Sequence, residues 1–185
     1  MLRLMAGPVR SRTLFDRVPL AVRMVAYAIA FLLMILVLVP WAAYHVDLLL
    51  PAWRPQWPIA VRVAGGVLFA LFLALYLFAS TWLSLRGRGA YVEFDPPKHF
   101  VAEGPFRYCR NPIAACVLGM LLSLALAASS IGILLLFVVA LPVAHAQVVL
   151  LEEPLLRRRF GKPYEDYLRR VPRWLPRRPR RTPPE

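Results

Sequence analysis

The residues best suited to chemistry flank a long apolar run. Arg107 and Arg110 stand just before a predicted helix start at Asn111, and two adjacent carboxylates, Glu152 and Glu153, end the run. Guanidinium groups at a helix N-terminus make a receptor for a carboxylate, because exposed N–H groups add donors and the dipole has the matching sign. Carboxylates at membrane depth are costly unless paired, which makes them functional candidates. The two sets form one site only if the fold brings them together.

Each candidate residue also has a structural interpretation, and the sequence alone does not decide between the functional and the structural one. The glutamates have interfacial partners in Arg157 and in the arginines of the preceding loop, and those arginines fit a role in membrane topology alone. His145 lies seven residues before Glu152, on nearly the same helix face two turns away. A lone histidine in a membrane helix is often a packing residue. Above a carboxylate, His145 becomes a candidate pocket residue.

The apolar run itself predicts a hairpin. Between Arg110 and Glu152 lie 41 residues without Asp, Glu, Lys or Arg. One helix of that length would span roughly 60 Å, about twice the hydrocarbon core of a bilayer. The predicted turn is at Ser129-Ser130, between arms at 112–128 and 131–151. Because a hairpin returns its ends to one face, the arginines and the carboxylates are predicted to be neighbours.

Two further charge-free runs, 24–44 and 63–85, are each long enough to cross a bilayer. The predicted fold is therefore all-α, an integral membrane bundle of four transmembrane helices with a cytoplasmic loop and short C-terminal cytoplasmic helices. The Pro/Arg-rich chain past Val171 is predicted to be disordered. The predicted segments are a basic leader (1–22), two transmembrane helices (23–85), a core with the hairpin (86–175) and a disordered basic tail (176–185).

The distribution of charge predicts the orientation. The formal net charge is +13, from 23 lysines and arginines and 10 acidic residues. A chain that crosses the membrane four times places only Arg54 and Arg62 on the far side, so the first face of the membrane, where the chain begins, has all the other lysines and arginines. The positive-inside rule makes the first face cytoplasmic, with both termini there and the inner membrane as the location. A basic tail that abuts a membrane helix favours membrane lipids as partners, and no nucleic acid is expected.

The two cysteines, Cys109 and Cys116, fall on the predicted cytoplasmic side, where thiols stay reduced. We therefore expect neither a disulfide nor a zinc site, and no metal is predicted because the sequence lacks a His/Cys cluster to complete one.

Two blocks of sequence, in order and spacing, resemble the isoprenylcysteine carboxyl methyltransferase and phospholipid methyltransferase superfamily. The similarity covers residues 86–175. The residues that carry it are Phe94-Asp-Pro-Pro-Lys98, Gly104-Pro-Phe-Arg-Tyr108, Arg110-Asn-Pro112, Glu152-Glu-Pro154, Leu156, Phe160-Gly161, Tyr164, Tyr167 and Val171-Pro-Arg-Trp174.

The resemblance implies a membrane methyltransferase that uses S-adenosylmethionine. The cofactor has a carboxylate, an ammonium and an adenine, and each needs its own receptor. The implied receptors are Arg110 and Arg107 for the carboxylate with Asn111 as a further donor, Glu152 or Glu153 for the ammonium, and Tyr164, Tyr167, Phe160 or Trp174 for the adenine. The implied base is His145 or a glutamate, where the acceptor must lose a proton.

The first motif departs from the family pattern Arg-His-Pro-x-Tyr-x-Gly. Asn111 replaces the histidine, Ala114 the tyrosine and Cys116 the glycine. A different or bulkier acceptor is one explanation, and loss of activity is another. The acceptor is expected to be a lipophilic small molecule or a lipid-modified molecule, methylated on a carboxylate, an amine or a thiol. A non-catalytic scaffold or a small transporter with the same fold are the alternative functions.

Overall fold

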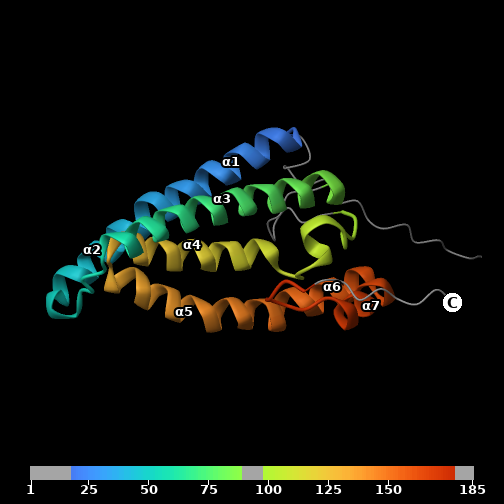
Figure 1. Cartoon of the computed structure of the whole chain (residues 1–185). Helices are drawn as coiled ribbons and strands as arrows, with labels where there is room; N and C mark the ends of the chain where they lie inside the picture. Colours follow the sequence, from blue (N-terminus) through green and yellow to red (C-terminus); the bar gives the residue numbers. More distant parts are fainter. Residues whose placement is uncertain (1–17, 89–97, 178–185) are drawn as a thin grey trace, which may run out of the picture.

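The structure is a computed structural model that describes residues 18–88 and 98–177 (Figure 1). Most of the predicted leader (1–22) and of the predicted tail (176–185) lies outside the described residues. The described chain is helical and contains no strand. Its elements are α1 (Leu20–Leu33), η2 (Met34–Leu38), α2 (Val39–Leu49), η3 (Pro51–Trp53), α3 (Ile59–Gly87), η4 (Gly104–Arg107), α4 (Pro112–Ala128), α5 (Ile131–Gln147), η5 (Val148–Glu152), α6 (Glu153–Phe160) and α7 (Lys162–Arg170).

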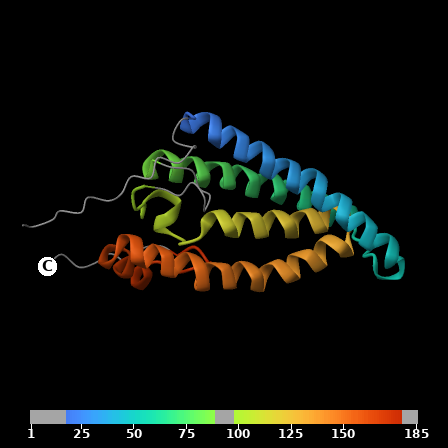
Figure 2. The ribbon, with the colours of Figure 1, turned by 180° about the vertical axis from the view of Figure 1, so that it is seen from behind.

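The long helices form an antiparallel bundle in which α4 packs against both α3 and α5, and α2 packs against α5 (Figures 1 and 2). The start of α1 lies at the same end of the bundle as α6 and α7, while η3 and the turn between α4 and α5 lie at the opposite end. We call these the arginine-rich end and the turn end. The predicted hairpin therefore exists, and it brings its two flanking segments to one end.

The hairpin turn is confirmed at Ser129-Ser130. Ser129 has a left-handed backbone with φ 51°, which ends α4. Ser130 then caps α5, because its Oγ accepts a hydrogen bond from the N–H of Ile133 at 3.1 Å. The observed α4 has the predicted bounds, and α5 begins at the predicted residue.

The first and last long helices each contain a π-helical segment near a proline. A proline has no N–H, so the carbonyl four residues earlier loses its helical partner. Pro40 and Pro154 deprive the carbonyls of Leu36 and Leu150, which lie inside η2 and η5 respectively. The wider hydrogen-bonding pattern of a π segment accommodates such a gap and shifts the faces of the helix that follows.

Small residues let the helices approach closely, as in membrane bundles generally. A Cβ added to Gly65 on α3 would lie 2.7 Å from the backbone nitrogen of Ala127 on α4. One added to Gly132 on α5 would lie 2.7 Å from the carbonyl oxygen of Ala43 on α2. Glycine is therefore required at both helix contacts.

Two helices are long and apolar enough to cross a membrane, Ile59–Gly87 with 29 residues and Ile131–Phe160 with 30. Their most apolar windows are only 22% and 11% buried, whereas the core helix of a soluble protein would be mostly buried. Sequence reasoning predicted four spans. The other two apolar segments are shorter as α-helices, because α4 has 17 residues and η2 interrupts the first helix.

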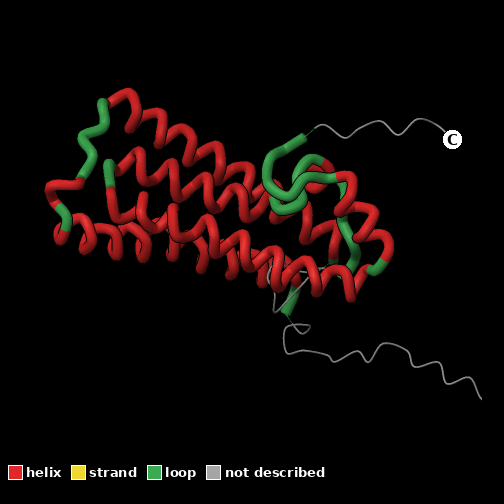
Figure 3. The backbone as a smooth tube through the Cα atoms, turned by 90° about the horizontal axis from the view of Figure 1, so that it is seen from below, coloured by secondary structure: helices red, strands yellow, loops and turns green. Residues whose placement is uncertain are grey.

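The C-terminal elements differ from the prediction in two ways. The sequence predicts short C-terminal helices separate from the membrane helices, but α6 continues α5 and η5 without a break, so Ile131–Phe160 is one helical rod. Gly161, with φ 59°, separates α6 from α7. The expectation of disorder past Val171 is wrong for the described residues, because 171–177 fold back onto residues 108–111 through hydrogen bonds (Figure 3). We call residues 171–177 the strap.

Candidate active site

A buried carboxylate, Glu153, is the centre of the arginine-rich end. Its side chain is 6% exposed, and its Oε1 accepts hydrogen bonds from Nη1 of Arg110 at 3.0 Å and from Nε of Arg173 at 2.8 Å. Nη2 of Arg173 donates to Oε2 at 3.1 Å, so Arg173 holds both carboxylate oxygens. Forked arginine–carboxylate contacts of this kind are among the stronger polar interactions in proteins.

Local structure explains why Glu153, rather than its neighbour, faces inward. Glu153 is the first residue of α6 after the π turn of η5, and residues adjacent on a helix point about 100° apart. Glu152 is half-buried and its Oε1 accepts a hydrogen bond from Nε2 of Gln147 at 3.4 Å. The pairing of Glu153 with Arg110 corresponds to the structural interpretation, in which a loop arginine partners a glutamate.

Arg110 retains unused hydrogen-bonding capacity. Its side chain is 12% exposed, and its Nε is buried with no hydrogen-bond partner among the residues that the structure describes. A buried donor without a partner is costly and calls for an explanation, such as a ligand. Arg110 lies two residues before the first residue of α4, so this donor is close to a helix N-terminus.

The other two residues predicted to bind the cofactor head take different positions. Arg107 ends η4 and is exposed, and within 18–88 and 98–177 it makes no ion pair with Glu153. Asn111 occupies the N-cap position of α4 as predicted, but its side chain does not cap the helix. Its Nδ2 instead donates to the carbonyl of Arg173 at 3.2 Å, because the strap lies against it.

His145 is exposed on α5 and contacts the strap. Its Nδ1 accepts a hydrogen bond from Nε1 of Trp174 at 3.1 Å, and the two rings have centroids 6.2 Å apart. Accepting at Nδ1 assigns the neutral tautomer with the proton on Nε2. His145 can therefore take a proton at Nδ1 only when Trp174 moves away.

Tyr164 and Tyr167 are part of an aromatic cluster rather than an open platform. They are 4% and 6% exposed, and the ring centroid of Phe100 lies 5.8 and 5.3 Å from theirs. The hydroxyl of Tyr167 donates to the carbonyl of Phe106 at 2.7 Å, which ties α7 to η4. Burial raises the pKa of Tyr164 to about 12 and also raises that of Tyr167, so both are neutral phenols near pH 7.

Cys109 lies beneath the strap. It is 2% exposed, and its Sγ is 3.1 Å from the carbonyl oxygen of Trp174 and 3.4 Å from that of Arg173. Burial raises the pKa of the thiol, while a backbone hydrogen bond from Asn111 and the charge of Arg110 oppose the shift. Cys109 therefore favours the neutral thiol, a hydrogen-bond donor to the strap.

Sequence reasoning did not assign a role to Arg173 or Phe100. Arg173 lies in the segment past Val171 that the sequence predicts to be disordered, yet it supplies two of the three hydrogen bonds to Glu153. A signal was present, since Arg173 lies in one of the blocks that carry the family resemblance. Phe100 lies between two of those blocks, after Lys98 and before Gly104, and nothing near it in the sequence indicates its ring contacts.

At the turn end, two exposed arginines bind helix-end carbonyls. Nε of Arg54 donates to the carbonyl of Ser129, and Nε of Arg62 to that of Ala127, each at 3.3 Å. These are carbonyls of the last turn of α4 and the residue that follows, which lack helical partners. Both cations therefore stabilise the hairpin turn.

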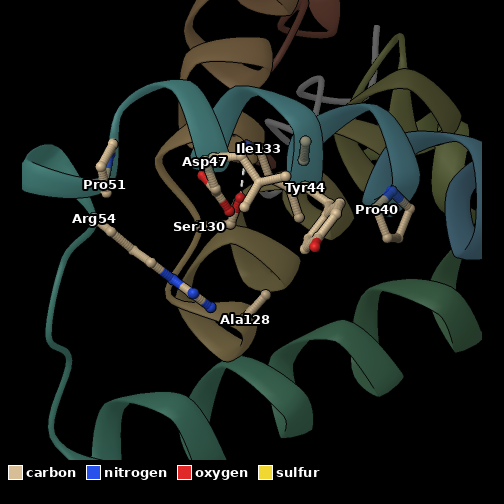
Figure 4. A pocket seen from close by; sticks show the side chains of 10 residues that line it. Pro40, Tyr44, Asp47, Pro51, Arg54, Ala128, Ser130 and Ile133 are labelled. Atoms are coloured by element: carbon tan, nitrogen blue, oxygen red, sulfur yellow. Dashed lines mark hydrogen bonds between the residues drawn. The ribbon is translucent and has the colours of Figure 1, made fainter.

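A cavity of about 320 Å³ lies beside this turn (Figure 4). Asp47 points into it from α2, and its Oδ1 accepts a hydrogen bond from the N–H of Gly132 at 2.9 Å, at the start of α5. The cavity is far from the predicted site residues. Its lining residues are Pro40, Ala43, Tyr44, Asp47, Leu48, Pro51, Arg54, Ala128, Ser130 and Ile133.

The fold and the site define a class: a small helical protein with two helices long and apolar enough to cross a membrane and a polar, ion-paired site at one end of its bundle. The profile of the phospholipid methyltransferase family matches residues 61–163, just over half of the chain, and includes α3 to α6 with Arg110 and Glu153. The chain therefore belongs to the phospholipid methyltransferase family, which indicates a membrane methyltransferase. No curated protein matches the chain.

Proposed function

We propose that this protein is an integral membrane methyltransferase that transfers a methyl group from S-adenosylmethionine to a lipophilic or membrane-associated acceptor. The observation that carries the proposal is Arg110. Among the residues that the structure describes, its Nε is a buried donor without a partner, beside Glu153, at the N-terminus of α4 and inside the family region. A free methionine-type head group carries the carboxylate and the ammonium that such a pair would bind.

The residues present fit the cofactor. Arg110 would hold its carboxylate through the spare donor, and Glu153 would hold its ammonium after Arg173 has moved away. The adenine would lie against an aromatic ring, with Phe160 at the edge of the cluster and Trp174 beside His145 as the less buried candidates. When bound, S-adenosylmethionine supplies an electrophilic methyl group and leaves as S-adenosylhomocysteine. The chain contributes by binding the head group, orienting it and excluding water.

The acceptor side of the reaction is assigned to the lipid-facing surface of α5. His145 is exposed there, and Nδ1 would take the proton from an acceptor that must lose one. In this proposal all four long helical segments cross the membrane, the arginine-rich end faces the cytoplasm, and both termini lie there. The acceptor enters laterally from the bilayer, and the cofactor arrives from the cytoplasm. The reactive atom of the acceptor is a carboxylate oxygen, an amine nitrogen or a thiol sulfur.

The test is calorimetric binding of S-adenosylmethionine and S-adenosylhomocysteine to the full chain in nanodiscs. We expect micromolar binding that is weakened at least about tenfold by Arg110→Lys, which retains the charge but loses the guanidinium fork and its Nε donor. Arg62→Lys at the turn end is the matched control and should bind like the wild type. Transfer of a labelled methyl group to lipid, amine and thiol acceptors then identifies the acceptor class.

Absence of binding in folded wild-type protein would overturn the proposal and favour the scaffold function. Equal binding by wild type and Arg110→Lys would retain a cofactor site but move it away from Arg110. Labelling of an engineered cysteine at exposed Lys98 only from outside the cell would overturn the orientation.

A further inference from the structure

The strap is fastened across the start of α4 by backbone hydrogen bonds. The N–H of Arg110 donates to the carbonyl of Pro172 at 2.9 Å, and the N–H of Arg177 donates to the carbonyl of Tyr108 at 3.0 Å. With the contact of Asn111 to the carbonyl of Arg173, these bonds hold the strap on both sides of Arg173. The position of the Arg173 side chain is therefore built into the fold.

Two strap side chains occupy the groups that the proposed function requires to be available. Arg173 donates to both oxygens of Glu153, and Trp174 donates to Nδ1 of His145. An ionised carboxylate has about four acceptor positions, and three hydrogen bonds to Glu153 are already made. A ligand ammonium needs the oxygens that Arg173 holds, and an acceptor proton needs the lone pair that Trp174 holds.

We infer that the strap is an internal competitor: in the free protein Arg173 occupies the position of the cofactor ammonium on Glu153, and Trp174 occupies the Nδ1 lone pair of His145. This inference rests on the proposed function, since it names the groups for which the strap competes. Cofactor binding requires the strap to release Glu153. The apparent dissociation constant then equals the intrinsic constant divided by the fraction of molecules whose strap is open.

Cys109 reports on the strap independently of any cofactor. Its thiol is 2% exposed and lies against the carbonyls of Arg173 and Trp174. A water-soluble maleimide reaches this thiol only when the strap lifts. Cys116, which is buried in the helix bundle against Tyr76 and Met120, is replaced in a Cys116→Ala background so that one thiol is counted.

The experiment compares Arg173→Gln with Arg177→Gln in full-length protein in nanodiscs. Arg177 lies in the same strap and loses the same charge, but its described contact is made by its backbone N–H, which the substitution keeps. We expect Arg173→Gln to label Cys109 about tenfold faster and to bind S-adenosylmethionine about tenfold more tightly than the wild type, because the open fraction rises. Arg177→Gln should match the wild type in both measurements.

Trp174→Phe provides a second variant with the ion pair intact. It keeps an aromatic ring but removes the donor to His145, so we expect a smaller increase in labelling than for Arg173→Gln. This variant tests the strap if Arg173→Gln fails to fold. Unchanged labelling in Trp174→Phe would then overturn the inference.

The remaining outcomes separate the inference from the function on which it rests. Faster labelling of Arg173→Gln with unchanged or weaker cofactor binding overturns the competitor role. Equal labelling of Arg173→Gln and Arg177→Gln overturns the claim that the Arg173 side chain holds the strap closed. Faster labelling with no cofactor binding in any variant, the wild type included, supports a strap closed by Arg173 and overturns the methyltransferase function.

Discussion

The two ends of the bundle use charged residues in opposite ways. At the turn end, Asp47 and both arginines hydrogen-bond to backbone groups of the α4–α5 hairpin. At the arginine-rich end, Arg110 and Arg173 both donate to the side chain of Glu153, and Arg110 has a buried donor left over. The first arrangement supplies hydrogen-bond partners to the ends of helices, whereas the second leaves a hydrogen-bond donor available to a ligand.

This difference separates a structural use of charge from a use in binding. A side chain bonded to a helix-end N–H or C=O replaces a partner that the helix always lacks, so nothing is gained by releasing it. In the proposed function, a carboxylate held by an arginine side chain exchanges that arginine for a ligand cation. The comparison therefore predicts that changes at the turn end affect stability alone, while changes at the arginine-rich end affect stability and binding.

The largest effect is expected for Glu153→Gln. Removing the carboxylate charge leaves the guanidinium groups of Arg110 and Arg173, with side chains 12% and 29% exposed, without their shared counter-ion. Breaking a buried ion pair on one side costs about 3 kcal/mol, and we expect unfolding in detergent, followed by circular dichroism, to show a loss of this order. Cofactor binding should be lost as well.

Glu152→Gln is the matched control because it makes the same change one residue earlier, at a half-buried position. We expect a smaller loss of stability than for Glu153→Gln. A larger loss for Glu152→Gln would contradict the assignment of Glu153 as the central carboxylate.

At the turn end, we expect Asp47→Ala to destabilise the protein by about 1 kcal/mol, because the N–H of Gly132 at the start of α5 loses its acceptor. Thermal unfolding measures this loss, and calorimetry on the same sample should show cofactor binding equal to that of the wild type. Weaker cofactor binding in Asp47→Ala would erase the proposed distinction between the two ends.

The smallest effect is a dependence on alkaline pH. The pKa of Tyr164 is raised by burial to about 12 from an ordinary value near 10. Because the folded pKa lies above the unfolded value, the contribution of Tyr164 to stability is complete below pH 10 and is lost as the pH rises toward 12. Ultraviolet absorbance of tyrosinate, compared between wild type and Tyr164→Phe, should show this residue ionising late. Ionisation near pH 10 in folded protein would indicate an exposed phenol.

The sequence was sufficient to predict the hairpin, its turn, the bounds of its first arm and the start of its second, whereas the second arm continues past the predicted end at residue 151 to Phe160. A charge-free run too long for one crossing must turn, and Ser129-Ser130 offered the polar break at its middle. Asn111-Pro112 marked the start of α4. These features depend on local preferences and on hydrophobic length, which a single sequence displays.

The partners of the candidate site could not be predicted in the same way. Adjacent glutamates differ by 100° of helix rotation, so the sequence predicts that one faces inward without indicating which, and η5 changes the register just before them. Arg173 lies in a Pro/Arg-rich segment whose composition is typical of disorder. Its contacts with Cys109 and Asn111, more than sixty positions away, and its hydrogen bonds to Glu153 give it a defined position.

By itself, the sequence determined that this protein is helical, that its apolar segments fold back on one another, and that most of its charge gathers at one end. These outcomes follow from hydropathy and charge along the chain. The tertiary structure decided that Glu153 is the buried carboxylate, that Arg110 keeps a buried donor without a partner among the described residues, and that the strap hydrogen-bonds to both Glu153 and His145. The reason is physical, because burial and side-chain pairing between distant segments depend on how helices pack, which no local pattern records.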